Sequence, residues 1–253
     1  MLQRTINAIA RRIGYEIVKR GESPPDFEKR HLDIVHRVTP FTLTGPERIY
    51  TLIESVRYLI KNDVPGAFVE CGVYKGGSMM TVALTLQGEG VNDRDLYLFD
   101  TFEGMPKPTD KDIDIHGVPA IKIFSKKKLS EVSSEWANAS LESVKNAMAS
   151  TGYPAERIHY VKGLVENTIP AQAPASIALL RLDTDWYQST KHEMDHLYQR
   201  VSRNGVTIVD DYGHFRGAKE AVDEYFSKHQ LTPFMHRIDY TGRLIVNDTP
   251  LNH

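Results

Sequence analysis

Four aspartates in two short segments are the residues of this sequence best suited to chemistry. Asp183 and Asp185 follow one short apolar run, and Asp210 and Asp211 follow the next. The two runs are typical of buried strands with one crossover helix between them, so we expect parallel neighbours whose carboxyl ends meet at one sheet edge. Crowded carboxylates raise one another's pKa, and a bound cation relieves their repulsion. Their oxygen ligands favour Mg²⁺, with Mn²⁺ or Ca²⁺ as alternatives, whereas helix capping and surface arginines are the competing explanation.

A glycine-rich turn forms the second pattern. Glu70, Gly72, Gly76 and Ser78 follow a short apolar run and open a helical pattern. Glycines at such a turn let a ligand approach the backbone, and the helix start offers free N–H groups. Asp100 ends the next apolar run, 24 residues after Gly76, where doubly wound folds bind a ribose diol. The turn alone could be a tight turn without a ligand, but together with Asp100 it indicates an adenosine-containing ligand.

Alternating strands and helices must position these residues. The predicted strands are 67–71, 96–99, 158–161, 177–182 and 206–209. The predicted helices are 44–62, 78–86, 141–149, 189–201 and 217–229. Thr44 and Glu47 have the spacing of a capping box at the start of the first helix, and segments 234–238 and 244–246 predict an antiparallel hairpin at the sheet edge. The pattern is typical of an α/β fold with helices on both faces of a mostly parallel sheet.

The N-terminal part has a different character. Residues 1–20 place isoleucines and a leucine at helical spacing, opposite a face rich in arginine. We expect a basic amphipathic helix that packs on the domain or on a second subunit, with contact to an anionic membrane surface as the alternative. Residues 21–43 show no clear periodicity and are interpreted as a connecting segment. The chain is therefore divided into an N-terminal helix and connecting segment (1–43) and one α/β domain (44–253).

Composition excludes several classes of protein. The 253 residues include 31 Lys and Arg against 33 Asp and Glu, a net charge of −2 that argues against a nucleic-acid partner. No apolar run is long enough for a transmembrane segment, and arginines interrupt the N-terminus where a signal peptide needs an apolar core. The single cysteine, Cys71, excludes an internal disulfide and a Cys-rich zinc site. We expect a cytoplasmic protein.

Five segments carry a resemblance to a known family. They are ERIYTLIESVRYLI, FVECGVYKGGS, LFDTFEGMP, LLRLDTDWYQST and TIVDDYGHFRGAKEAVDEY. From about Pro46 to Tyr225 the sequence resembles the macrocin O-methyltransferase (TylF-type) family. The resemblance implies an S-adenosylmethionine- and Mg²⁺-dependent enzyme with the Rossmann-like class I methyltransferase fold, a seven-stranded sheet with an antiparallel last strand.

The resemblance also implies roles for individual residues. The cofactor-binding residues would be Glu70, Gly72, Val73, Ser78, Asp100, Thr101 and Phe102. The metal ligands would be Asp183, Asp210 and Asp211. The chain departs from the usual family pattern at Thr184, which replaces a glycine, and at Gln188, which replaces a glutamate. Segment 106–136 matches poorly, and in such enzymes this region tends to be a substrate lid.

Methyl transfer to a hydroxyl requires a base that removes its proton. We interpret Asp183 or Asp185 as that base, with His116 and His214 as alternatives. The resemblance favours a small-molecule or glycan acceptor, in particular a sugar hydroxyl on a natural product or polysaccharide, with a phenolic diol as the alternative. The apolar stripe of the first helix makes a homo-oligomer the expected state.

Two other functions compete with methyl transfer. Asp183-Thr-Asp185 could be the DxD motif of a metal-dependent nucleotide-sugar glycosyltransferase, but this leaves the glycine-rich turn and the Asp210-Asp211 pair unexplained. The chain could instead be a non-enzymatic adaptor that binds membrane surfaces through its first helix. Deletion of residues 1–20 separates the cases, because an adaptor loses its function and a methyltransferase that stays folded keeps catalysis.

Overall fold

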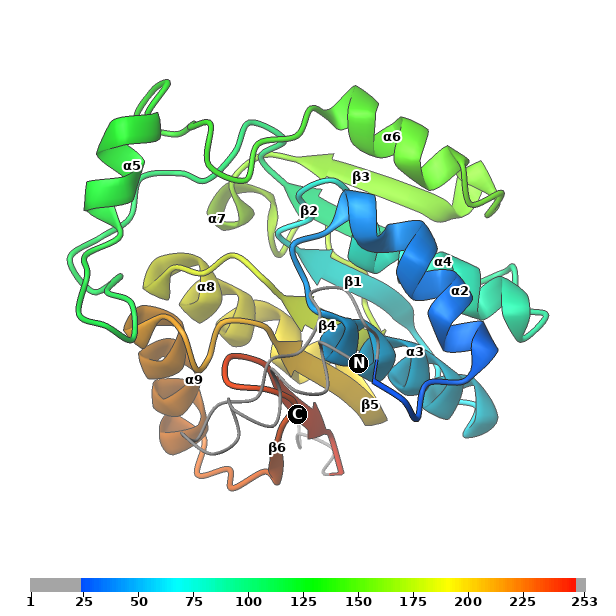
Figure 1. Cartoon of the computed structure of the whole chain (residues 1–253). Helices are drawn as coiled ribbons and strands as arrows, with labels where there is room; N and C mark the ends of the chain where they lie inside the picture. The colour runs from blue at the N-terminus through cyan, green and yellow to red at the C-terminus, as the bar shows by residue number, and fades with distance from the viewer. Residues whose placement is uncertain (1–23, 249–253) are drawn as a thin grey trace, which may run out of the picture.

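A seven-stranded, mostly parallel sheet forms the centre of the protein (Figure 1). The computed structural model describes residues 24–248. The strand order is β3-β2-β1-β4-β5-β7-β6, in which the first five strands are parallel and β7 and β6 are antiparallel. This is the Rossmann-like class I methyltransferase fold, so the expected fold class and the antiparallel hairpin at the sheet edge are confirmed.

The strands follow the predicted order. They are β1 (Ala67–Cys71), β2 (Leu96–Asp100), β3 (Ile158–Lys162), β4 (Ile177–Leu182), β5 (Val201–Val209), β6 (Met235–Arg237) and β7 (Arg243–Val246). β5 begins earlier than its apolar run indicates. Val206 pairs with Leu179 of β4, and beyond a register shift Val201 pairs with Ile177, which extends the strand toward its N-terminus. The sheet therefore brings the ends of β1, β2, β4 and β5, which carry the candidate residues, to one edge.

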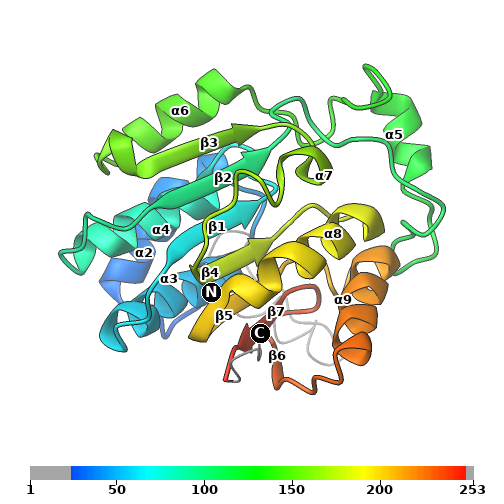
Figure 2. The same cartoon turned by 180° about the vertical axis from the view of Figure 1, so that it is seen from behind.

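Helices cover both faces of the sheet (Figures 1 and 2). They are α2 (Lys29–Val38), α3 (Pro46–Lys61), α4 (Gly77–Gly88), α5 (Ile121–Lys127), α6 (Leu141–Ala149), α7 (Val165–Thr168), α8 (Tyr187–Leu197) and α9 (Arg216–Lys228). Short 3-10 helices lie at Thr39–Phe41, Ala155–Arg157 and Tyr198–Arg200. α2, α3, α4 and α6 lie over one face, and α7, α8 and α9 lie over the other.

Alternation along the strands supplies one hydrophobic core to each face. In β1, Phe68 packs in the core under α2, α3 and α4, and its neighbour Val69 packs in the core under α8 and α9. In β2, Leu98 likewise packs in the first of these cores and Phe99 in the second. Both faces of the central strands are buried, which explains why their sequences are apolar except for a few residues such as Glu70 in β1 and Arg181 in β4.

Two predictions near the N-terminus are corrected. Segment 21–43, interpreted as a connecting segment, contains helix α2, which packs against α3 and α4. Its buried stripe is His31, Val35 and Val38, and the spacing escapes notice because one of its members is a histidine. The predicted capping box is also wrong, since the N-cap of α3 is Gly45 and the Thr44 hydroxyl instead accepts a hydrogen bond from Arg181.

Segment 106–136 and the residues beside it form a long excursion between β2 and α6 that carries α5 (Figure 2). Isolated bridges join Ile113 to Pro119 within the segment and Asp114 to Phe215 outside it. The predicted basic helix in residues 1–20 lies outside the described residues. Between residues 24 and 248, no helix is both long and apolar enough to cross a membrane.

Candidate active site

A cavity of about 470 Å³ lies at the carboxyl ends of the parallel strands. Its walls come from the segment before α3, the turn after β1, the end of β2, segment 163–167, and the residues after β4 and β5. Residues 104–109 and 131–137, at the two ends of the excursion, close another side. The volume is in the range of small-molecule sites, and the position is that of ligand sites in open α/β sheets.

The glycine-rich turn brings β1 against β4. Gly72 has a φ of +83°, and a Cβ there would lie 2.1 Å from the carbonyl oxygen of Asp183. Any other residue would therefore push the first acidic residue after β4 away from the turn. Gly76, with a φ of +92°, is the N-cap of α4. The turn thus requires glycine for backbone geometry, as the sequence pattern indicates.

Asp100 fixes the shape of the turn. Its Oδ2 accepts the backbone N–H of Val73 at 2.6 Å and that of Tyr74 at 3.2 Å, and its Oδ1 accepts the N–H of Phe102 at 2.6 Å. Burial raises the pKa of Asp100, and these backbone donors oppose the shift. One carboxylate therefore ties the end of β2 to the turn after β1.

The structure brings most of the predicted cofactor-binding residues together. Gly72, Val73, Ser78, Asp100 and Thr101 line the cavity. Glu70 and Phe102 are buried and are not among the lining residues. The cofactor-binding roles of all seven residues stay predictions.

A buried arginine organises the acids behind the cavity. Arg181, one residue before the end of β4, has a side chain only 4% exposed. Its Nη1 lies 2.6 Å from Glu70 Oε1 and 2.7 Å from Asp183 Oδ2, and its Nη2 lies 2.6 Å from Asp210 Oδ1. Burial raises the pKa of Glu70 to about 7, although the Arg181 charge opposes this shift. Among the residues that the structure describes, none is a hydrogen-bond partner of the other Glu70 oxygen, Oε2.

Asp210 is held by two arginines. Besides its contact with Arg181, its Oδ2 accepts a hydrogen bond from Nη1 of Arg48, near the start of α3. Arg48 also pairs with Asp239 at 3.2 Å. Asp210 is buried, so this pairing neutralises a charge that would otherwise be costly inside the protein.

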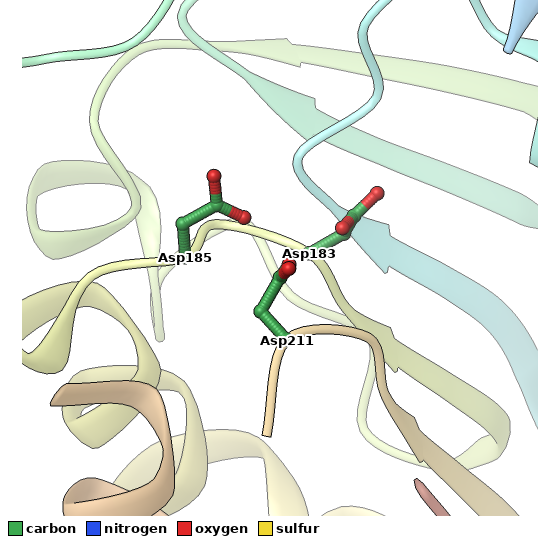
Figure 3. A group of neighbouring side chains, drawn as sticks. All are labelled: Asp183, Asp185 and Asp211. Atoms are coloured by element: carbon green, nitrogen blue, oxygen red, sulfur yellow. The ribbon is translucent and has the colours of Figure 1, made fainter. Parts of the chain in front are cut away.

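Three other carboxylates converge on the cavity (Figure 3). Asp183, Asp185 and Asp211 each place an oxygen within 4.8 Å of those of the other two. Burial, together with the charges of Asp183 and Asp210, raises the pKa of Asp185 to about 7. Burial and neighbouring acids also raise the pKa values of Asp183 and Asp211 well above normal. This set has too much negative charge for its environment, so it favours either bound protons or a cation.

Two tryptophan rings line one side of the cavity. Trp136 and Trp186 both line it and meet edge to face with centroids 5.4 Å apart. Trp186 Nε1 donates to the carbonyl oxygen of Pro106 at 3.1 Å. Asp112, fully buried, accepts the N–H of Tyr187 at 2.7 Å. These bonds fasten segment 106–136 to the start of α8.

The histidines considered as bases do not line the cavity, since neither His116 nor His214 is among its wall residues. Arg48, Asp112 and Arg181 belong to the site but were not predicted from the sequence. A charged residue inside the apolar run 177–182 is a readable signal for Arg181, because a buried strand tolerates an arginine only when acids neutralise it. Arg48 lies on an ordinary helix and gives no comparable signal.

Comparison with known proteins identifies the family. The family model for macrocin-O-methyltransferase (TylF) matches residues 5–245. The chain belongs to the macrocin-O-methyltransferase (TylF) family. The match extends well beyond residues 46–225, so the predicted limits of the resemblance were too narrow. As a TylF family member, the protein is an S-adenosylmethionine-dependent O-methyltransferase.

Individual relatives of this TylF family member are also O-methyltransferases by name. Demethyldecarbamoylnovobiocin O-methyltransferase of Streptomyces niveus is 30% identical over 201 residues, which are 79% of this chain and 73% of the relative. A tetracenomycin rhamnosyl 4'-O-methyltransferase of Streptomyces olivaceus is 29% identical over 221 residues, or 87% and 81% of the two chains. The solved structure of the O-methyltransferase NovP superposes with a TM-score of 0.72 at 28% identity, covering 83% of each chain.

Proposed function

We propose that this enzyme transfers the methyl group of S-adenosylmethionine to a sugar hydroxyl of a natural product or polysaccharide, with a divalent cation, Mg²⁺ first, at the acidic cluster. The observation that carries the proposal is the shared cavity, in which the turn held by Asp100 lies beside the acids after β4 and β5. Donor and acceptor can then meet over the strand ends without a large movement of the sheet.

The names of the relatives support a sugar acceptor. The relative from Streptomyces olivaceus is named for methylation of a rhamnosyl group. In this chain, Trp136 and Trp186 offer ring surface on the cavity wall next to the acidic cluster. Aromatic side chains with a few placed polar groups are typical of such a ligand wall. The nucleotide-sugar alternative has no comparable support, because it leaves the turn and Asp100 without a function.

The donor set fits a hard cation. Asp183 and Asp211 belong both to the ligand set implied by the family and to the group whose oxygens lie together. Mg²⁺ is commonly held by one or two carboxylates with water or substrate oxygens in the other positions. Asp183 and Asp211 are therefore the proposed ligands. Asp210, the third ligand implied by the family, would first have to leave Arg48 or Arg181.

Methyl transfer requires a proton acceptor for the hydroxyl of the acceptor. The acceptor oxygen attacks the methyl carbon, the carbon–sulfur bond breaks with its electron pair on sulfur, and the hydroxyl proton passes to a carboxylate. Asp185 is the proposed proton acceptor, because it lines the cavity and its raised pKa of about 7 suits a general base. Asp183 is the other candidate. The cation, when bound, would lower the pKa of the hydroxyl and orient it.

Mn²⁺ binding tests the ligand assignment without any acceptor. Titration followed by electron paramagnetic resonance should show binding that Asp183→Asn and Asp211→Asn abolish. Asp185→Asn should weaken binding far less. Loss of binding in Asp210→Asn as well would contradict the assignment to Asp183 and Asp211 alone and favour the three-ligand set implied by the family. Binding kept in Asp211→Asn would contradict both sets.

Methyl transfer itself is tested with isotope-labelled S-adenosylmethionine and a panel of sugar and phenolic acceptors. We expect a methyl ether on a sugar hydroxyl, with EDTA and Asp185→Asn each reducing the rate strongly. Methylation of phenolic diols alone would contradict the sugar assignment, and full activity in EDTA would contradict the cation. A cytoplasmic location and a homo-oligomeric state stay predictions.

A further inference from the structure

Asp185 lies in a backbone turn that needs outside support. Its φ is +65°, in the left-handed region that residues other than glycine rarely adopt. The N–H of Trp186 donates to the carbonyl oxygen of Thr184 at 2.7 Å. Asp185 is therefore the middle residue of a three-residue turn, a rare and strained conformation when φ is positive. Such turns persist only where the surrounding structure holds them.

Asp183 and Trp186, near the two ends of this turn, are held by hydrogen bonds to other parts of the chain. The N–H of Asp183 donates to the carbonyl oxygen of Cys71 at 2.8 Å, which ties the start of the turn to β1. Trp186, only 3% exposed, is tied to the excursion through its indole N–H. Thr184, between Asp183 and Asp185, is held through its side chain.

Glu193 supplies that support from α8. The Thr184 hydroxyl donates to both carboxyl oxygens of Glu193, at 3.0 and 3.1 Å. Glu193 is fully buried, and a buried carboxyl without a partner would destabilise the protein. A glycine at position 184 would have no hydroxyl to donate to Glu193, so the pair depends on the threonine side chain.

We propose that Glu193 is a positioning residue for methyl transfer, which acts by holding Thr184 so that the strained turn keeps the Asp185 carboxylate beside Asp211. Glu193 touches neither the cavity nor the reacting atoms, since it is absent from the cavity wall. The inference rests on the proposed function, because it assigns Asp185 work in the reaction. It predicts that the hydroxyl at position 184 matters more than the bulk of the side chain.

The test compares matched variants at both positions. Thr184→Val removes the hydroxyl at nearly constant volume, whereas Thr184→Ser keeps it. Glu193→Leu removes the acceptor, whereas Glu193→Gln keeps an acceptor of the same shape. The measurements are kcat and KM for both substrates, the affinity for S-adenosylhomocysteine, and amide hydrogen exchange in peptides that cover residues 183–187.

We expect Thr184→Val and Glu193→Leu to lower kcat by roughly tenfold or more, because small displacements of a reacting group are costly. Thr184→Ser and Glu193→Gln should stay close to wild type. The affinity for S-adenosylhomocysteine should stay within about twofold in all four, because the Thr184 hydroxyl bonds to Glu193 in α8 and not to the turn after β1. Thr184→Val combined with Glu193→Leu should lose no more than either change alone.

Some outcomes would overturn the proposal. Full kcat in Thr184→Val would show that the hydroxyl is not needed. An equal loss in Glu193→Gln and Glu193→Leu, or a loss of cofactor affinity with kcat, would indicate a purely structural role. Amide hydrogen exchange is measured without an acceptor. It therefore tests the Thr184–Glu193 pair even when the wild type methylates no acceptor in the panel. Faster exchange in Thr184→Val than in Thr184→Ser supports the pair, and equal exchange refutes it.

Discussion

Replacing Arg181 with methionine tests the electrostatics of the site. Methionine keeps much of the volume of the side chain but removes the charge that faces Glu70, Asp183 and Asp210 at 2.6 to 2.7 Å. It also removes the hydrogen bond to Thr44 at 3.2 Å. The variant therefore leaves three buried or half-buried acids without their common partner.

The magnitude follows from burial. Removing one partner of a buried ion pair costs about 3–5 kcal/mol of unfolding free energy, because the remaining charge stays desolvated. For a chain of this size, that loss corresponds to a drop in Tm of roughly 6–20 °C. Protonation of the acids removes their buried charge and so reduces this loss of unfolding free energy. Without Arg181 the native pKa values of Glu70 and Asp183, which burial already raises, rise further above the unfolded values. The variant should therefore lose stability as pH rises and recover part of it toward pH 5.

Urea unfolding at two pH values measures the effect. The control is Lys162→Met, which breaks an ion pair of similar length, 2.7 Å to Glu103, between side chains that are about half exposed. An exposed pair contributes at most about 1 kcal/mol. A loss in Arg181→Met no larger than the control, or one that grows toward acid pH, would refute the electrostatic account of the acids behind the cavity.

Two further predictions concern stability. Glu70 has a pKa raised from 4.5 to about 7, so it holds a proton more tightly in the folded state than in the unfolded state. As pH rises between these values, wild type should therefore lose stability relative to Glu70→Gln, by about 3 kcal/mol in total. Unfolding curves of both proteins from pH 4 to 8 check this, and a constant difference in unfolding free energy would contradict it. Gly217→Ala places a Cβ 2.4 Å from Asp112 Oδ1 and 3.0 Å from Tyr187, whereas at Gly88 a Cβ meets nothing within 4 Å. We expect a loss of about 1–3 kcal/mol for Gly217→Ala and no loss for Gly88→Ala in thermal unfolding; equal values would show that Asp112 is not tightly held.

Much of the fold could be predicted because its strands are buried on both faces. The predicted and observed bounds agree for β1 and β4, where apolar runs end abruptly at glycine or aspartate. Helix α2 was missed because a buried histidine, bonded to Glu54 at 2.9 Å, fills an apolar position. The N-cap of α3 was misplaced because tertiary contact with Arg181 takes Thr44 away from the local role that its spacing indicates.

The site shows the same division between local and tertiary information. The sequence predicts that the acids after β4 and β5 meet, because strand ends of a parallel sheet share an edge. It does not show which acids face one another, since that depends on the arginines. Arg48 and Arg181 form ion pairs with Asp210. Asp185 has a positive φ, and its carboxylate lies near that of Asp211. Neither the partner choice nor the turn has a local sequence signal.

Calorimetric titration of S-adenosylhomocysteine tests the central claim most directly, namely that the turn held by Asp100 binds the cofactor beside the acidic cluster. Wild type should bind at about micromolar Kd. Asp100→Asn should weaken binding at least about tenfold, because it removes a charged acceptor of backbone N–H groups. Asp183→Asn should keep the wild-type affinity. Absence of binding in wild type, or unchanged binding in Asp100→Asn, would contradict this account of the site.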